Sequence, residues 1–292
     1  MRRAEPTQSD HDDHDLHDHD RGLAFDLATL LERRRVLGLF AGISLASLVG
    51  CTTSSNPTTS RSSPANPTTS TAPTTTATST GTDASCAEIP EETAGPYPGD
   101  GSNGPNILTQ SGIVRSDIRS SFGSASGIAA GVPLTINLTI LNLSQGCSVV
   151  SGAAVYLWHC DINGNYSMYS QAVAGENYLR GVQESNGNGA VTFKSIFPAA
   201  YSGRWPHVHF EVYSSPAQAT SAGSKMATSQ LALPADVCRS VYGTDGYGQS
   251  VRNLAQTSLE TDNVFRDGYS RQLATVTGSV SSGYVASLTV PV

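Results

Sequence analysis

The chain has 292 residues, of which 14% are charged and 38% are hydrophobic, and its formal net charge at pH 7 is −7. This length allows one large domain or two small ones. The acidic balance and the lack of a basic patch in the sequence exclude a protein that binds nucleic acid through its charge.

The first 50 residues carry the features of an export signal. Arg33 and Arg34 precede an apolar stretch that ends at Cys51 and is too short to span a bilayer. The arginine pair resembles a twin-arginine signal, and Leu48 to Cys51 resembles a lipobox, in which Cys51 receives the lipid. We therefore expect an exported protein held at the cell surface by a lipid anchor, its only association with a membrane. An ordinary secretory signal that ends at a cysteine is the alternative.

Residues 51–85 differ in composition from the rest of the chain. They are mostly Thr, Ser, Pro, Ala and Asn, without the apolar periodicity that a core requires. The sequence predicts a solvated linker here, followed by a folded domain over residues 86–292.

The folded domain is predicted to be all-β. Short β-type runs separated by turn residues are typical of a β-sandwich with long loops. The runs occupy residues 133–143, 152–160, 190–197, 207–213 and 284–292, with tight turns expected at 163–165 and 187–189. Short helices are expected only at 235–242 and 250–257.

Four cysteines follow Cys51 in the chain. An even number of cysteines in an exported protein predicts two disulfides, and three pairings are possible. The four residues are Cys86, Cys147, Cys160 and Cys238.

Two histidines in one predicted strand indicate a metal site. His207 and His209 are two residues apart in the run His-Val-His-Phe-Glu-Val-Tyr, so both imidazoles are expected on one face of the strand. Two histidines satisfied by neighbouring polar groups would give the same pattern, so further ligands are needed to decide.

Four ordered motifs resemble the intradiol ring-cleavage dioxygenases, the family of protocatechuate 3,4-dioxygenase and catechol 1,2-dioxygenase. Their details are most similar to the exported, single-domain branch of that family. The motifs are EETAGPYPGDG (91–101), WHCDINGNYS (158–167), FPAAYSGRWPHVHF (197–210) and ATSQL (227–231).

The resemblance implies a ferric ion, Fe(III), as the cofactor. Its ligands would be Tyr166, Tyr201, His207 and His209. This donor set is physically reasonable, because phenolate oxygens suit a hard trivalent ion, whereas Zn²⁺ or Fe²⁺ favours imidazole, thiolate or carboxylate. A tyrosine whose ordinary pKa is about 10 ionises at neutral pH only beside such a cation.

The resemblance also implies the reaction. A catechol-type aromatic diol and O₂ would be the substrates, and the ring would open between the two hydroxylated carbons to give a muconate-type diacid. Tyr201 would leave the metal and act as a base, Arg204 would stabilise negative charge on the ring, and Gln230 would line the substrate pocket. Only five residues separate Tyr201 from His207, fewer than in the cytoplasmic members, so a more open pocket is expected. The identity of the diol and the oligomeric state stay open.

Against this background we expect disulfides between Cys160 and Cys238 and between Cys86 and Cys147, since the loop of Cys238 could reach Cys160. His159 follows Trp158 at the end of its run and is assigned to packing rather than to the metal.

Two other classes of function fit parts of the sequence. A non-catalytic lipoprotein could bind carbohydrate or peptide by stacking on Trp158, Trp205 and Tyr201. A zinc hydrolase could use His159 with the two histidines of the strand, although no well-placed carboxylate accompanies them.

Overall fold

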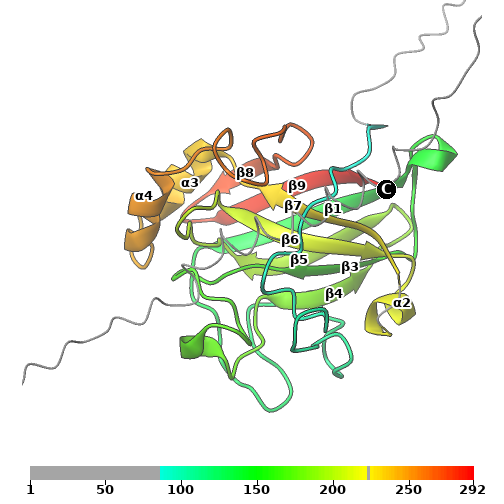
Figure 1. The fold of residues 1–292 in the computed structure, drawn as a ribbon, viewed down its shortest axis with the longest axis horizontal. Coiled ribbons are helices and arrows are strands. Elements are labelled where there is room, and N and C mark those ends of the chain that lie inside the picture. Colours follow the sequence, from blue (N-terminus) through cyan, green and yellow to red (C-terminus); the bar gives the residue numbers. More distant parts are fainter. Residues whose placement is uncertain (1–85, 222–223) are drawn as a thin grey trace, which may run out of the picture.

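Two β-sheets form the body of the protein in the computed structural model, which describes residues 86–221 and 224–292 (Figure 1). In the first sheet β1 pairs with β2 and β5 on one side and runs parallel to β9 on the other, and β9 pairs with β8. Its strands are β1 (Pro133–Asn142), β2 (Ser148–Val149), β5 (Ala190–Ile196), β8 (Thr275–Ser279) and β9 (Gly283–Pro291). The second sheet is fully antiparallel in the order β4-β3-β6-β7. Its strands are β3 (Ala154–Trp158), β4 (Arg180–Glu184), β6 (His207–Tyr213) and β7 (Lys225–Ala232).

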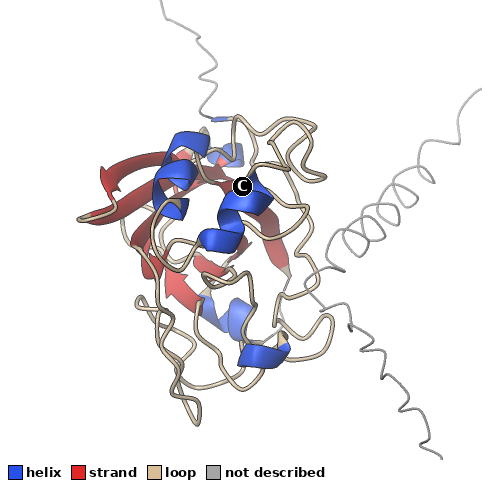
Figure 2. Cartoon of the chain, turned by 90° about the vertical axis from the view of Figure 1, so that its left-hand side faces the viewer, coloured by secondary structure: helices blue, strands red, loops and turns tan. Residues whose placement is uncertain are grey.

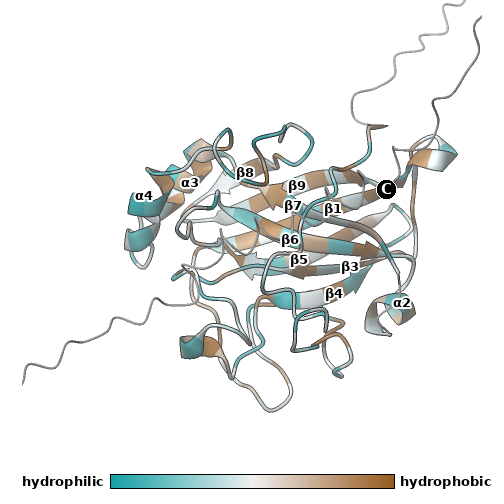
Figure 3. Cartoon of the chain, in the orientation of Figure 1, coloured by the Kyte–Doolittle hydropathy of each residue, from teal (hydrophilic) through white to brown (hydrophobic). Residues whose placement is uncertain are grey.

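Alternating side chains of the two sheets form the core between them. Successive residues of a strand point to opposite faces, so every second residue of β1 is buried. The second sheet faces this layer with residues such as Leu157 and Phe210. Figure 3 shows the resulting concentration of hydrophobic residues on the strands, while α4 (Gly248–Leu254) is largely hydrophilic. The inward residues of β1 are Leu134, Ile136, Leu138 and Ile140.

Helices are few and short in residues 86–221 and 224–292. Besides α4 they are α2 (Pro216–Thr220), α3 (Ala235–Tyr242) and the 3-10 turns η3 (Leu143–Gln145) and η4 (Gln171–Val173). Figure 2 shows that the helices lie outside the two sheets. One of them has a direct bearing on the loop that carries Tyr201. Two side chains of α4, Ser250 and Asn253, hydrogen-bond the backbone N–H and C=O of Ala200 at 3.1 and 2.9 Å.

The outer face of the second sheet is covered by loops rather than by another sheet. The segment that follows residue 86, cyan in Figure 1, runs across the strands of this sheet, and its Glu92 N–H donates to the carbonyl of Thr228 on β7. The loop between β3 and β4 packs on the same face, where Tyr166 joins Tyr156 and Trp158 in a second apolar cluster. The outer face is therefore buried, although it carries the polar side chains of the sheet.

The prediction of an all-β sandwich is confirmed. The five predicted runs coincide with β1, β3, β5, β6 and β9, and α3 spans the predicted residues 235–242. Strands β2, β4, β7 and β8 and helix α2 were not predicted. No helix in the described part of the chain is long and apolar enough to cross a membrane. The expected export signal, the linker and the lipidation of Cys51 fall outside the described residues.

One predicted disulfide is present and the other is not. Cys86 and Cys147 are bonded with a Cα–Cα distance of 6.0 Å, as predicted. The prediction of a bond between Cys160 and Cys238 is wrong, because both are free and buried. Cys160 lies in the apolar cluster on the outer face and Cys238 in the core between the sheets, and each thiol contacts a backbone carbonyl. Burial raises the pKa of both thiols, which leaves them neutral and unreactive.

Loss of the one disulfide is expected to cost stability. In the double variant Cys86→Ser, Cys147→Ser, the free energy of unfolding should fall by about 2–4 kcal/mol, because the bond closes a long loop in the unfolded chain. Urea denaturation measures this change. Peptide mapping of unreduced protein should also show alkylation of Cys160 and Cys238 only after unfolding. A cross-linked peptide containing both would contradict the structure.

Candidate metal centre

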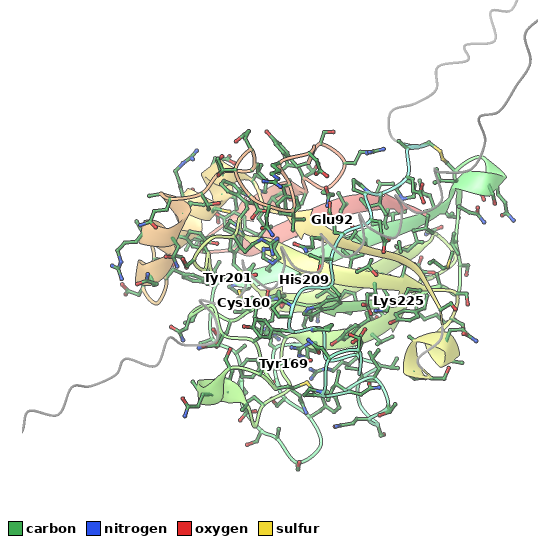
Figure 4. All side chains as sticks on the ribbon, in the orientation of Figure 1. Glu92, Cys160, Tyr169, Tyr201, His209 and Lys225 are labelled. Atoms are coloured by element: carbon green, nitrogen blue, oxygen red, sulfur yellow. A yellow bond between two sulfur atoms is a disulfide. The ribbon has the colours of Figure 1, made fainter. Side chains whose placement is uncertain are left out.

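Four polar side chains converge on one point at the outer face of the second sheet. Nε2 of His207 lies 3.2 Å from the phenol oxygen of Tyr201, 3.4 Å from that of Tyr166 and 3.1 Å from Nε2 of His209. All four residues are buried, and Tyr201 is the most exposed of them at 8%. The structure thus brings together the four residues that the sequence predicts as metal ligands, and Figure 4 shows Tyr201 and His209 close together.

Different elements bring these four side chains together. His207 and His209 lie on β6, and their side chains leave the same face of the strand, as the alternation predicts. Tyr166 follows a tight turn after β3, in which the carboxylate of Asp161 accepts the N–H groups of Asn163 and Asn165.

A glycine in this turn allows the two tyrosines to approach each other. Gly164 has φ +84°, a conformation that favours glycine, and a Cβ there would lie 3.0 Å from the Cβ of Tyr201. The predicted turn at 163–165 therefore places the Tyr166 and Tyr201 loops side by side.

The tautomer of His207 is fixed by its second ring nitrogen. Nδ1 hydrogen-bonds the carbonyl of Trp205, and since a carbonyl only accepts, Nδ1 carries the proton. Burial, followed by the charge of Arg204, lowers the pKa of His207 to about 3. The ring is therefore neutral, and its Nε2 presents a lone pair to the other three groups.

The ring of His209 is held by stacking on Trp158 rather than by a hydrogen bond at its Nδ1. Its ring lies parallel to the indole of Trp158, with 4.9 Å between centroids and 6° between planes. Its Nδ1 is buried and has no hydrogen-bond partner. Burial and then His207 lower the pKa of His209 well below the ordinary value, so this imidazole is neutral as well.

The phenol of Tyr166 needs a neighbouring cation in order to ionise. Burial and then the neighbouring Tyr201 raise the pKa of Tyr166 well above 10, so the protein alone keeps this phenol neutral. Ligands about 2 Å from one ion at angles near 100° are about 3 Å apart, and the other three donors lie 3.1–3.4 Å from Nε2 of His207. Two phenols and two neutral imidazoles thus fit a small, hard cation, and Fe(III) suits phenolate oxygen best.

Arg204 lies beside the four donors with its guanidinium held on two sides. Its Nε donates to Asp262 at 3.0 Å and one of its terminal nitrogens donates to the amide oxygen of Gln230 at 2.6 Å. Gln230 in turn donates to the carbonyl of Thr93 at 2.9 Å. Gln230, which was expected to line the substrate pocket, therefore orients Arg204 in this structure.

Asp262 is a site residue that the sequence analysis missed. Besides Arg204, its carboxylate accepts the backbone N–H groups of Trp205, Val264 and Phe265. Burial acts to raise the pKa of Asp262, but the charge of Arg204 and these hydrogen bonds hold it below its usual value. Asp262 lies 58 residues after Arg204 in a loop without a recognisable pattern, so no sequence signal could have found it.

His159 is not a member of the cluster. Its Nδ1 contacts the carbonyl of Cys160 at 2.8 Å and its Nε2 contacts the hydroxyl of Ser195 at 2.6 Å, so both nitrogens are used in packing. Within residues 86–221 and 224–292 no group of three or more His, Cys, Asp or Glu side chains is placed to hold a metal. The zinc hydrolase with His159 as third ligand has no support in this geometry.

The two tryptophans are also unavailable as a stacking surface. Trp158 is completely buried under the loops, and Trp205 is 5% exposed with its indole N–H donating to the carbonyl of Leu233. A carbohydrate-binding platform needs exposed aromatic faces, and these residues do not provide them.

The ion pair of Arg204 and Asp262 should matter for stability. Replacement Asp262→Asn leaves a buried guanidinium without its counter-charge, and a loss of about 3–5 kcal/mol is expected. Because the pKa of Asp262 is lowered in the folded state, its contribution is complete above the ordinary carboxyl pKa of about 4 and is lost as the pH falls below it.

Urea denaturation between pH 3 and pH 7 measures both effects. The matched control is Asp117→Asn, in the exposed pair of Asp117 with Arg119, which should cost at most about 1 kcal/mol. Equal losses in the two variants would show that the buried pair has no special role.

Comparison with known proteins supports the fold. No protein-family model and no curated protein matches the sequence. Among solved structures, the intradiol ring-cleavage dioxygenase from Tetranychus urticae matches with a TM-score of 0.56 and 24% identity, covering 70% of this chain and 94% of that one. A dioxygenase domain from Streptomyces sp. SirexAA-E matches with a TM-score of 0.46 and 20% identity over 70% of this chain and 98% of its own. The first match identifies the architecture: the described part of this chain has the fold of the intradiol ring-cleavage dioxygenases.

Proposed function

We propose that the protein is a non-haem Fe(III) intradiol dioxygenase that opens the ring of a catechol-type diol between its two hydroxylated carbons. The observation that carries the proposal is the convergence of two phenol oxygens and the Nε2 of His209 on the Nε2 of His207, at distances of 3.1–3.4 Å from it. The fold supports the same conclusion, and so do the four sequence motifs.

Three of the four proposed ligands are suited to hold the ion permanently. Tyr166, His207 and His209 are each 2% exposed, and the two rings of the histidines are fixed by Trp205 and Trp158. Ferric iron at this point would supply a Lewis acid that binds a catechol as its dianion and makes the ring reactive toward O₂.

Tyr201 is suited to a different role, that of a ligand that leaves the metal and acts as a base. It is the most exposed ligand, and it lies in the loop between β5 and β6 rather than on a strand. When a diol binds, a phenolate released at this position would accept a proton from a substrate hydroxyl. The backbone before it is held by α4 through Ala200, so the loop would stay in place if the Tyr201 side chain moved.

Arg204 supplies a fixed positive charge next to the ligands. Asp262 and Gln230 hold the guanidinium on two sides, and its charge contributes to the low pKa of His207, so its field acts at the site. A charge held in this way can stabilise the negative charge that develops on the opening ring without reorganising at the moment of reaction.

The ligand assignment predicts the loss of iron in defined variants. Tyr166→Phe, His207→Ala and His209→Ala should each lose most bound iron and the red colour of tyrosinate-to-iron charge transfer, because each removes one donor. Metal analysis and a visible spectrum of protein loaded with Fe(III) measure both.

The control is Tyr213→Phe, which removes the hydroxyl of a buried tyrosine on the same sheet face that donates to the carboxylate of Glu211. This variant should keep its iron and colour. A Tyr166→Phe variant with full iron and an unchanged spectrum would refute the assignment.

The product distinguishes the proposed chemistry from the other way of opening a catechol. The ferric protein should convert catechol to cis,cis-muconate, with both atoms of ¹⁸O₂ entering the product apart from exchange with water. Mass spectrometry of the product measures this, and Arg204→Ala should bind catechol with a change of colour but turn over at least about 100-fold more slowly. A yellow semialdehyde, the product of cleavage beside the diol, would contradict the mechanism.

A further inference from the structure

We propose that Arg180 is a positioning residue that fixes the Tyr166 phenol in the metal site by clamping two loops together. The proposal rests on the proposed function, because Tyr166 is treated as a metal ligand. Arg180 is 1% exposed and lies on β4, where it pairs with Trp158, the residue that stacks on His209. No sequence motif pointed to it.

The guanidinium of Arg180 uses all of its hydrogen-bond donors. An arginine side chain has five N–H groups, and five hydrogen bonds of 2.9–3.1 Å leave this one. Two go to the carbonyls of Tyr97 and Pro98, two go to the hydroxyl and the carbonyl of Ser167, and one goes to the hydroxyl of Tyr156. All five acceptors are neutral, so the contacts position atoms rather than neutralise charge.

These partners lie on both sides of Tyr166. Ser167 is the next residue in the chain, and its hydroxyl also donates to the carbonyl of Tyr178 at 2.7 Å. The ring of Tyr97 packs against the ring of Tyr166 with 4.9 Å between centroids. Arg180 therefore fixes the backbone that follows Tyr166 and, through Tyr97, one face of its ring.

Backbone geometry shows how closely the clamp is built. Met168 and Leu179, the neighbours of Ser167 and Arg180, have φ values of 72° and 57°, which residues other than glycine rarely adopt. Such conformations persist when surrounding contacts fix them. At Gly99 a Cβ would lie 2.9 Å from the Arg180 guanidinium. The loop that carries Tyr97 and Pro98 therefore approaches Arg180 as closely as a glycine allows.

The test compares the buried Arg180 with the partly buried Arg115. Arg180→Lys keeps the charge but offers three donors on one nitrogen, which cannot reach acceptors on both loops. Arg115→Lys is the control, because the Arg115 side chain also donates to backbone carbonyls, those of Asn177, Arg180 and Ser120, but contacts neither Tyr97 nor Ser167.

Two measurements are made on each variant: hydrogen exchange of residues 166–170 in metal-free protein, and titration with Fe(III) followed by the visible band. In Arg180→Lys we expect exchange to be faster and iron affinity to be weaker by about tenfold or more, the effect of losing one charge-assisted hydrogen bond. Arg115→Lys should change neither, even if its melting temperature falls. Unchanged exchange and affinity in Arg180→Lys would overturn the proposal.

A second pair of variants decides the matter if Arg180→Lys does not fold. Ser167→Ala and Tyr156→Phe each remove one acceptor from the same guanidinium, but only Ser167 adjoins Tyr166. Faster exchange at residues 166–170 in Ser167→Ala supports the clamp, and exchange unchanged from the wild type in that variant refutes it. The exchange measurement needs no iron, so wild-type protein that binds no Fe(III) would defeat the proposed function without deciding the role of Arg180.

Discussion

The register of the second sheet is the constraint on which the candidate site depends. Arg180, Trp158, His209 and Gln230 are paired in one row across β4, β3, β6 and β7, so their side chains leave the same face of the sheet. Each does a different task there: Arg180 contacts the loop of Tyr166, Trp158 stacks on His209, and Gln230 holds Arg204. A shift of one residue in any strand would turn its member of the row into the core between the sheets.

Electrostatics around the row favours an anion-rich occupant. The phenol of Tyr166 and the two imidazoles are neutral in the protein alone, and after burial and His207, the buried guanidiniums of Arg204 and Arg180 also lower the pKa of His209. In the proposed enzyme, the phenolate of Tyr166 and a diolate substrate would be the anions in these surroundings, and together they would balance the charge of Fe(III). The spacing of the four donors and the positive charge of Arg204 and Arg180 thus both suit a metal ion that carries anionic ligands.

The sequence revealed those parts of the protein that follow a local pattern. Strands with an apolar core face, such as β1 and β6, were predicted because their alternation is visible, and His207 and His209 were placed on one face for the same reason. β4 (RGVQE) was missed because it is short and polar, and its first residue is Arg180. Arg180, which contributes to the site, is thus one of the polar residues that make β4 hard to recognise in the sequence.

Long-range contacts explain the other failures. Asp262 reaches Arg204 from a distant loop, and neither composition nor spacing marks it. The number of cysteines left three pairings open, and of the two bonds that we expected, Cys86–Cys147 is present and Cys160–Cys238 is not. The number of cysteines says nothing about whether a thiol is buried in apolar surroundings. Tertiary packing decides both the partner of Arg204 and the state of the cysteines, and no single segment of the sequence predicts it.

The Cys86–Cys147 disulfide also determines which part of the fold would receive a mechanical force applied to the chain before Cys86. Cys147 follows the end of β1, whereas the start of β1 lies beside Phe197 and the loop that leads to Tyr201. A strand of ten residues is about 33 Å long, so Cys86 is fastened roughly one strand length from that loop. Force applied to the chain before Cys86 would pass through the disulfide to the end of β1 near Cys147. The end of the sandwich that holds Tyr201 would lie on the side away from Cys86.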